Sequence, residues 1–266
     1  MEALIQNCRI YYRHEKSDSS DAPTLLLLHG WGCDSSIFSA FENEWLKHTS
    51  LLVVDFPGHG QSAEPPEPWG VPEYAEQIFE LLKHLSIEKV DIAAHSFGGR
   101  VAIYLASHHP EKIGKMVFTG AAGIREPVSQ AKTKRQKQYQ FFKSMLMTLG
   151  KLPFMKTLVE KWMDRLRQHY GSTDYKKLKS DTMRKTFVKV ITQDLSALLS
   201  QIRASTLLIW GSLDTATPLW MGQKMEQEIP DAGFVIFEGR THFAFLEESQ
   251  RFQVIASTFF WGGKTV

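Results

Sequence analysis

The stretch that decides the fold reads VDIAAHSFGGR and occupies residues 90–100. An apolar run of strand character, a sharp turn at Ser96 and a helix-like segment from Arg100 to His109 form a strand-turn-helix unit. Gly98 leaves room where the strained turn brings the backbone close to the strand and the helix. Ala94 replaces the first glycine of the usual Gly-x-Ser-x-Gly pattern, which keeps the site small but adds a Cβ. We therefore expect Ser96 to present its hydroxyl at the edge of a sheet.

Two later segments place a carboxylate and an imidazole just past predicted strands. Residues 207–210 are typical of a buried strand and lead to Asp214, and residues 234–237 lead to His242. A serine hydroxyl is a poor nucleophile at neutral pH, so it needs an imidazole within hydrogen-bond reach to take its proton. A carboxylate on the other imidazole nitrogen fixes the tautomer and stabilises the imidazolium. The sequence therefore predicts a triad of Ser96, Asp214 and His242.

This chain order resembles the α/β-hydrolase superfamily, and the resemblance covers nearly the whole chain. A further match is VVDFPGHGQS at residues 53–62, which is similar to the family's loop after its fourth strand. The resemblance implies an α/β fold with a doubly wound, mostly parallel sheet of the eight-stranded type and an inserted helical cap. It also implies Ser96 as nucleophile, His242 as base and Asp214 as the orienting acid, with no cofactor and no metal. A serine nucleophile argues against the dehalogenase and epoxide-hydrolase branches, which use a carboxylate.

The loop after the first long apolar run is the candidate oxyanion hole. Residues 24–28 are strand-length and apolar after Thr24, and they lead to His29-Gly30-Trp31-Gly32, where glycines let the backbone turn its N–H groups toward a ligand. In the resemblance the backbone N–H groups of Trp31 and Phe97 would stabilise the oxyanion of the transition state. The alternative for this loop is a plain strand-to-loop turn.

Other residues compete for the same roles. His29 and His95 flank the site and are the main alternatives to His242 as base, although the resemblance makes them pocket-lining or structural. Asp55 is the rival acid, since some relatives place an acid nearby. The other possible acid position follows the sixth predicted strand, but residues 116–121 contain no carboxylate, which favours Asp214.

Length and composition narrow the class of protein. A chain of 266 residues with 43% hydrophobic residues can bury a sizeable core, so one α/β domain with an insertion fits. No apolar run approaches membrane-spanning length and the start lacks a secretory pattern, so a cytoplasmic location is the expectation. The two cysteines are too few for a disulfide framework, and their spacing is not that of zinc ligands. No nucleic-acid recognition module is evident, so no nucleic-acid partner is expected.

The near-neutral net charge of +2 hides a basic insertion. From Arg125 to Lys189 there are seventeen Lys or Arg and five Asp or Glu, against fourteen and twenty-four in the rest. Many relatives carry a helical cap at this point, so we expect a cap at residues 123–191 and a hydrolase core at 1–122 and 192–266. Apolar residues recur there at helical spacing: Tyr139, Phe142, Met145, Leu146 and Leu149, then Phe154, Met155, Leu158, Val159, Trp162, Met163 and Leu166.

Three roles remain open for this basic cap. Its lysines could form a solvated face while the apolar stripe packs on the main domain, could attract an anionic small-molecule substrate, or could contact an acidic membrane surface reversibly. Methionines adapt to irregular shapes, so the stripe also indicates a deformable apolar pocket. The candidates for lining this pocket are His29, His95, Phe142, Met145 and Trp162. The pattern leaves the oligomeric state open.

The predicted activity is hydrolysis of an ester-like bond through an acyl-enzyme, as in a carboxylesterase, thioesterase or lactonase acting on a small or medium, partly apolar substrate. Two alternatives use the same triad: hydrolysis of a carbon–carbon bond, and a lyase reaction, because SFGGR at residues 96–100 resembles the elbow of menaquinone-pathway lyases of this fold. A third alternative is a ligand-sensing receptor of the same fold with little turnover.

Overall fold

A computed structural model describes residues 1–17, 23–125, 130–149, 155–170 and 172–262. Its contacts divide the chain into two compact units. We call Met1–Arg125 with Lys185–Val266 the core unit and Glu126–Arg184 the helical unit. The expected cap, residues 123–191, extends beyond the helical unit at both ends.

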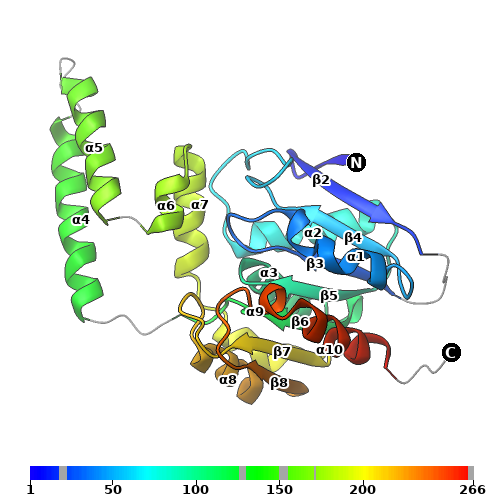
Figure 1. The fold of residues 1–266 in the computed structure, drawn as a ribbon. Coiled ribbons are helices and arrows are strands. Elements are labelled where there is room, and N and C mark those ends of the chain that lie inside the picture. The colour runs from blue at the N-terminus through cyan, green and yellow to red at the C-terminus, as the bar shows by residue number, and fades with distance from the viewer. Residues whose placement is uncertain (18–22, 126–129, 150–154, 171, 263–266) are drawn as a thin grey trace. The chain divides into compact units, whose positions relative to one another are not determined.

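The strands of the core unit form one sheet in the order β1-β2-β4-β3-β5-β6-β7-β8 (Figure 1). The order β4-β3-β5-β6-β7-β8 is parallel throughout, whereas β2 pairs antiparallel with both β1 and β4. This mostly parallel, doubly wound sheet confirms the predicted fold class. The strands in the described part of the chain are β1 (Glu2–Ile5), β2 (Cys8–Glu15), β3 (Thr24–Leu28), β4 (Leu51–Asp55), β5 (Val90–His95), β6 (Ile113–Thr119), β7 (Thr206–Gly211) and β8 (Ala232–Phe237).

The helices connect these strands, and the long helical insertion lies between β6 and β7 as predicted (Figure 1). None of the described helices is both long enough and apolar enough to cross a bilayer. Their bounds are η1 (Ser35–Phe38), α1 (Ser39–Trp45), α2 (Val71–His84), α3 (Phe97–His108), η2 (Pro110–Lys112), α4 (Gln130–Leu149), α5 (Lys156–Tyr170), α6 (Thr173–Lys177), α7 (Asp181–Thr192), η4 (Ser196–Gln201), α8 (Leu219–Glu228), α9 (Ala244–Glu247) and α10 (Ser249–Trp261).

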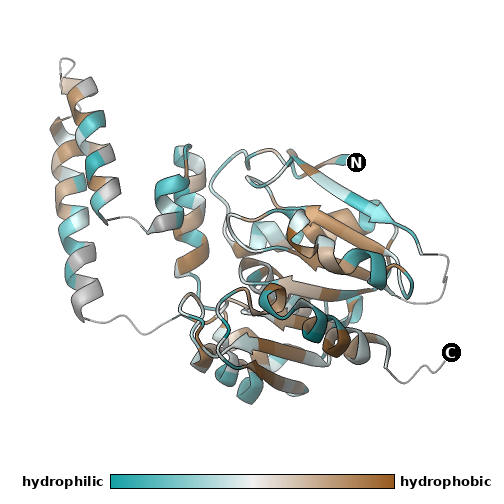
Figure 2. Cartoon of the chain, viewed as in Figure 1, coloured by the Kyte–Doolittle hydropathy of each residue, from teal (hydrophilic) through white to brown (hydrophobic). Residues whose placement is uncertain are grey.

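Two hydrophobic layers lie on the two faces of the sheet. In β3, Leu25 and Leu27 point into the layer formed with α1, α9 and α10, while Leu26 and Leu28 point into the layer formed with α2, α3 and α8. Alternate side chains of a strand point to opposite faces, so a strand buried on both sides needs a continuous apolar run. Figure 2 shows the central strands mostly in brown, the colour of hydrophobic residues. The sheet therefore holds its carboxyl ends rigidly in register.

The contact between α3 and β3 depends on Gly98. A Cβ at this position would lie 2.2 Å from the backbone oxygen of Leu28, which cannot move without disturbing the sheet. We expect Gly98→Ala to lower the free energy of unfolding by about 1–3 kcal/mol, because overpacking forces a backbone shift. Urea denaturation followed by circular dichroism measures this. Gly233→Ala is the matched control, since its nearest neighbour lies at 3.8 Å. Equal midpoints for the two variants would contradict the close-approach argument.

Candidate active site

Ser96 occupies a strained turn between β5 and α3. Its φ is +50° and its ψ is −108°, a conformation that side-chain-bearing residues rarely adopt. The backbone N–H of Ser96 donates to the carbonyl of Thr119 at 3.2 Å, and its own carbonyl accepts from Gly99 at 3.0 Å and Ala122 at 2.9 Å. Such outliers persist only where the surroundings hold them, and they cluster at functional sites. The turn thus fixes one serine at the carboxyl edge of the sheet.

Asp214 and His242 meet across the loops that follow β7 and β8. The Asp214 Oδ2 atom lies 2.8 Å from His242 Nδ1. The other oxygen, Oδ1, accepts from the backbone N–H groups of Ala216 and Thr217, both at 2.9 Å. The Asp214 side chain is fully buried, whereas the His242 side chain is 17% exposed. The carboxylate is therefore locked in place, and the imidazole remains accessible.

Thr217 completes this arrangement. Its hydroxyl lies 2.8 Å from Asp214 Oδ2, 3.0 Å from the carbonyl of Gly120 and 3.3 Å from His242 Nδ1. Gly120 has a φ of +51°, and a Cβ there would lie 3.0 Å from His242 Nδ1. The turn after β6 therefore forms a wall behind the imidazole, which restricts the orientation of the ring.

The surroundings of Asp214 keep it ionised. Burial alone would raise its pKa, but the hydrogen bond and charge of His242, followed by the hydrogen bonds from Thr217, hold the pKa below its ordinary value. An ionised carboxylate accepts a hydrogen bond from the Nδ1 proton of His242. That bond uses Nδ1, so Nε2 is the ring nitrogen left to face a substrate.

The nucleophile and the base lie in the same neighbourhood without a closed hydrogen bond. The ring of His95, the residue before Ser96, lies 4.7 Å from the ring of His242 between centroids. Among the described residues, the Ser96 hydroxyl makes no hydrogen bond, so it does not donate to His242. Catalytic hydrogen bonds are often long in unliganded sites and tighten when substrate binds. The triad therefore stays a prediction, with Asp214 and His242 in contact and without a hydrogen bond from Ser96 to the imidazole among the described residues.

The two predicted oxyanion donors flank Ser96. A Cβ at Gly30, next to Trp31, would lie 3.3 Å from Ser96 Cβ, so the loop after β3 runs alongside the serine. Phe97 is the first residue of α3, and the N–H of a first helical residue has no partner within its helix. The rings of Trp31 and Phe97 also contact each other, at 5.4 Å between centroids. The fold thus brings both backbone donors to the turn.

The alternative bases and the alternative acid have structural partners. His29 is fully buried; its Nδ1 lies 2.7 Å from the carbonyl of Gly30, and its Nε2 accepts from the N–H of Phe56 at 3.0 Å. His95 is 1% exposed and its Nδ1 donates to the carbonyl of Thr119 at 2.9 Å. Asp55 accepts from the backbone N–H groups of Ser35 at 2.7 Å and Gln61 at 2.8 Å. These three side chains hold loops together around the site.

Buried histidines make the stability of the fold sensitive to acid. Burial lowers the pKa of His59 and His95 to about 3, and it also lowers the pKa of His29. In the unfolded chain these imidazoles bind protons near their ordinary pKa of 6.5, while in the folded protein they stay neutral. The unfolded state therefore binds more protons below pH 6.5. The stabilisation present above that pH is lost as the pH falls from 6.5 toward 3.

We expect the urea midpoint to fall from neutral pH to about pH 5, before most carboxylates titrate. Each buried histidine contributes a slope of up to about 1.4 kcal/mol per pH unit. The measurement is urea denaturation at a series of pH values. His95→Gln should reduce the slope, and His84→Gln, at an exposed position, should leave it unchanged. A midpoint that stays constant over this range would contradict the expectation.

The remaining pocket candidates belong to the helical unit. Phe142 is 39% exposed and Met145 46% exposed on α4, and Trp162 is partly buried in the contact between α4 and α5. They stay predictions as pocket residues.

The comparison with known families gives a single clear result. The family model for the alpha/beta hydrolase fold matches residues 23–249, which is most of the chain. The chain belongs to the α/β-hydrolase family.

Relatives of this α/β hydrolase act on several kinds of bond. A pimeloyl-[acyl-carrier protein] methyl ester esterase of Nitrosomonas europaea is 26% identical over 88% of this chain and 94% of its own. A 2-hydroxymuconate semialdehyde hydrolase of Pseudomonas putida is 25% identical over 93% of this chain and 90% of its own. An esterase structure from Exiguobacterium antarcticum shares the fold with a TM-score of 0.74 and 22% identity, covering 98% of both chains.

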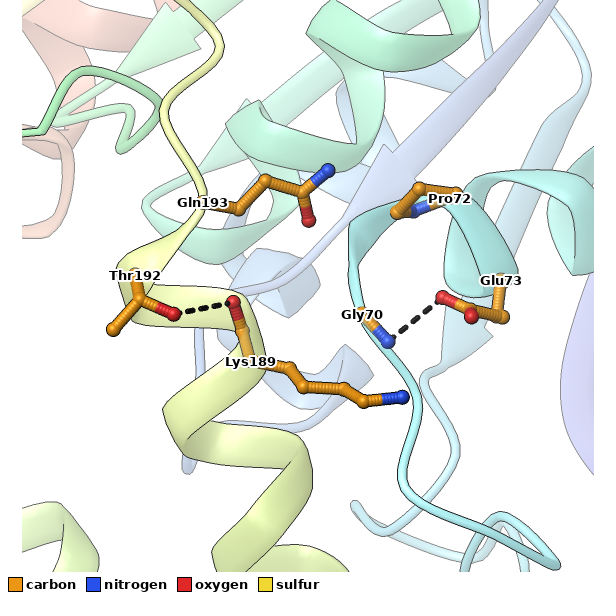
Figure 3. Close-up of a pocket in the computed structure, with 6 residues that line it drawn as sticks. All are labelled: Gly70, Pro72, Glu73, Lys189, Thr192 and Gln193. Atoms are coloured by element: carbon orange, nitrogen blue, oxygen red, sulfur yellow. Dashed lines mark hydrogen bonds between the residues drawn. The ribbon is translucent and has the colours of Figure 1, made fainter.

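A pocket of this α/β hydrolase lies away from the predicted triad, between the start of α2 and the end of α7 (Figure 3). Its polar groups are engaged: Glu73 accepts from the N–H of Gly70 at 2.8 Å, Gln193 accepts from Val71 at 3.1 Å, and Lys189 donates to the carbonyl of Pro68 at 2.6 Å. The pocket is thus a junction that anchors α7 to the core unit. Its lining residues are Gly70, Pro72, Glu73, Lys189, Thr192 and Gln193.

Sequence patterns do not predict the part that two residues, Thr217 and Gly120, play in the candidate site. Thr217 follows Asp214 by three residues, a spacing typical of a turn in which an aspartate accepts from nearby backbone N–H groups. That signal suggests only a local role for Thr217. Its contacts with Gly120 and His242 join residues 97 and 25 positions apart, and no local pattern predicts such contacts.

Proposed function

We propose that this protein is a serine hydrolase that cleaves an ester-like bond through an acyl-enzyme. The observation that carries the proposal is the hydrogen bond between Asp214 and His242 beside a serine held at a positive φ. A nucleophile, a base and a group that orients the base are the parts that acyl transfer requires. The exposed fraction of the His242 side chain leaves the imidazole open to a substrate.

In the proposed mechanism, Ser96 Oγ attacks the carbonyl carbon while His242 Nε2 takes the hydroxyl proton. The carbonyl oxygen becomes an oxyanion, which the N–H groups of Trp31 and Phe97 stabilise; one such donor is worth roughly 3–4 kcal/mol of barrier. The imidazolium, balanced by the charge of Asp214, then protonates the leaving alcohol as the carbon–oxygen bond breaks. Water attacks the acyl-enzyme with the same imidazole as base, which releases the acid and restores the serine.

Relatives support an ester-like substrate and also favour a second candidate. The methyl ester esterase relative from Nitrosomonas europaea supports cleavage of an ester-like bond, the class that includes carboxylesterase, thioesterase and lactonase activity. The 2-hydroxymuconate semialdehyde hydrolase of Pseudomonas putida matches a similar share of this chain. It favours hydrolysis of a carbon–carbon bond as the second candidate. The lyase alternative has weaker support, because Arg100 of the SFGGR stretch is 7% exposed and donates to the carbonyl of Gln193 at 2.7 Å.

A fluorophosphonate probe tests the proposal directly, because it forms a covalent bond with an activated serine and needs no knowledge of the natural substrate. We expect labelling of Ser96, identified by mass spectrometry of the peptide that contains it, and turnover of short and medium p-nitrophenyl esters. Labelling should disappear in His242→Ala, which keeps the serine but removes its base. Labelling of any other serine, or none at all, would overturn the assignment of Ser96 as nucleophile. Labelling without ester turnover would favour the carbon–carbon candidate.

A further inference from the structure

The first helix of the helical unit, α4, has an unusual charge. Over its twenty residues it carries five Lys or Arg and no Asp or Glu. The whole helical unit has fourteen Lys or Arg against five Asp or Glu. A helix with charges of one sign repels itself and gains no ion pairs along its length, so this composition has a cost in isolation. The same positive charge attracts α4 to an anionic surface.

The helical unit has a small core of its own. Leu146 of α4 packs with Val159 and Met163 of α5, and each of the three is less than 8% exposed. Leu149 and Met155, at the two ends of the connecting segment, join this cluster. Figure 1 shows α4 and α5 side by side, as an antiparallel hairpin. The apolar residues in this cluster are used for packing the two helices against each other.

Other large apolar side chains of the hairpin lie outside that core. Phe141 is 67% exposed, Met147 59%, Met145 46%, Leu158 41% and Phe142 39%. Isolated exposed apolar residues are common, but these are interleaved with exposed cations. On α4, Lys134, Lys137, Phe141 and Met145 follow one another at spacings of three and four residues, so they share one face.

A second face with the same chemistry lies on α5. Leu158, Lys161 and Arg165 are exposed and are spaced by three and four residues. On both helices the exposed apolar residue directly precedes a contact residue: Met145 precedes Leu146, and Leu158 precedes Val159. Antiparallel helices turn in opposite senses when viewed along one direction, so the two faces lie on the same side of the hairpin. We call these seven residues the basic apolar face: Lys134, Lys137, Phe141, Met145, Leu158, Lys161 and Arg165.

We propose that the basic apolar face docks the protein on an anionic lipid surface. Lysine and arginine heads reach the phosphate groups while their aliphatic stems lie along apolar surface. Phe141, Met145 and Leu158 enter the boundary between headgroups and acyl chains, as in helices that lie in the interfacial plane. Each Lys or Arg near an anionic leaflet strengthens binding by about fivefold. The inference is independent of the activity proposed above, because none of the seven residues belongs to the triad.

The charge and the exposed apolar side chains of the basic apolar face together favour a lipid surface over a protein or a nucleic acid as its binding partner. An acidic protein or a nucleic acid matches the cations but gives no reason for a 67% exposed phenylalanine among them. Pairing of two such faces from two copies of the chain would bring cations against cations, because the helical unit carries fourteen Lys or Arg against five Asp or Glu. The acidic core unit of a second copy is the other protein partner to consider, and the experiment below distinguishes it from a lipid surface. An anionic bilayer matches both features, since it offers phosphates over an apolar interior.

Vesicle binding tests the proposal with the full chain. Sucrose-loaded vesicles of equal parts phosphatidylcholine and phosphatidylglycerol are sedimented with the protein, and vesicles of phosphatidylcholine alone are the comparison. We expect binding to the anionic vesicles that weakens as salt is raised, because screening reduces the attraction. Lys134→Gln with Lys137→Gln should weaken binding about twentyfold. Phe141→Ser with Met145→Ser should weaken it about tenfold or more.

Matched controls lie on the same helix. Lys143→Gln removes one lysine charge of α4 from outside the basic apolar face. Met147→Ser removes one methionine side chain of α4 from outside that face. Both variants should bind the anionic vesicles as the wild type does. Helical circular dichroism should be unchanged in every variant, and labelling of Ser96 by the fluorophosphonate probe should be unchanged in the lysine variants and in Met147→Ser, which leave the pocket candidates in place. The proposal is overturned by no binding to anionic vesicles, by equal binding to neutral ones, or by controls that lose as much as the face variants. Association of two copies that depends on Phe141 and Met145, without vesicle binding, would also overturn it.

Discussion

Ser96→Ala is expected to abolish turnover, with kcat reduced by about 10⁵-fold. The reason is that water and the remaining groups can stabilise the transition state but cannot form the acyl-enzyme. Substrate affinity should change little, since the lost hydroxyl is small and the two backbone donors remain. The measurement is steady-state hydrolysis of p-nitrophenyl esters, from acetyl to long acyl chains, by wild type and variant in parallel. The chain-length optimum of the wild type also measures the size of the acyl pocket.

Two further variants give this prediction its controls. Ser107→Ala removes a hydroxyl from the same helix, where it donates to the carbonyl of Tyr104, and should leave kcat unchanged. Ser96→Ala combined with His242→Ala should lose little more than either change alone, because residues of a triad act as one unit. Near-normal turnover in Ser96→Ala would rule out the acyl-enzyme mechanism. Additive losses would show that the serine and the histidine act independently.

Asp214→Asn is expected to lower kcat by about 10⁴-fold while the fold is retained. An asparagine has the same size, but its amide can donate to His242 Nδ1 and so favours the tautomer that carries its proton on Nε2. A ring with that proton cannot accept from Ser96. Ester hydrolysis, with circular dichroism to confirm folding, measures the effect. Activity close to wild type would show that another group orients the imidazole.

Thr217→Val provides the graded comparison for Asp214→Asn. Valine keeps the shape of threonine but removes the hydroxyl that lies 2.8 Å from Asp214 Oδ2 and 3.0 Å from the carbonyl of Gly120. We expect a loss of roughly ten- to a hundredfold, the range of a single buried hydrogen bond. A positioning role also predicts a change in the pH profile of kcat/KM, because the carboxylate that stabilises the imidazolium loses a donor. A loss in protein stability without any change in that profile would indicate a purely structural role.

Much of this fold is readable from the sequence because its sheet is buried on both faces. Runs such as residues 25–28 and 207–210 are continuously apolar, which few other structures require. The pairing of Asp214 with His242 is also predictable, since the carboxyl ends of neighbouring parallel strands meet at one edge of the sheet. In the structure Asp214 has two roles, because one oxygen accepts from the backbone of the following turn and the other contacts the imidazole.

Other parts of the site depend on contacts that local patterns do not encode. Glycine is needed at position 120 because the backbone turns there with a positive φ, directly behind His242. The sequence around Gly120 does not indicate that His242 lies beside it. Likewise, His29 and His95 look like candidate bases in the sequence. Their partners are backbone groups such as Gly30, Phe56 and Thr119, which only the packed loops bring within reach.

The position of the proposed base, His242, has a consequence for how the protein loses activity. His242 follows β8, which lies at the end of the strand order, pairs with β7 alone among the described strands and is mostly half-buried. Strands at such edges open locally at a lower free energy than global unfolding requires. Ser96 directly follows β5, which lies in the middle of the sheet. Fraying of one outer strand would therefore separate the base from the nucleophile while most of the molecule stays folded, and inactivation on mild heating would precede melting.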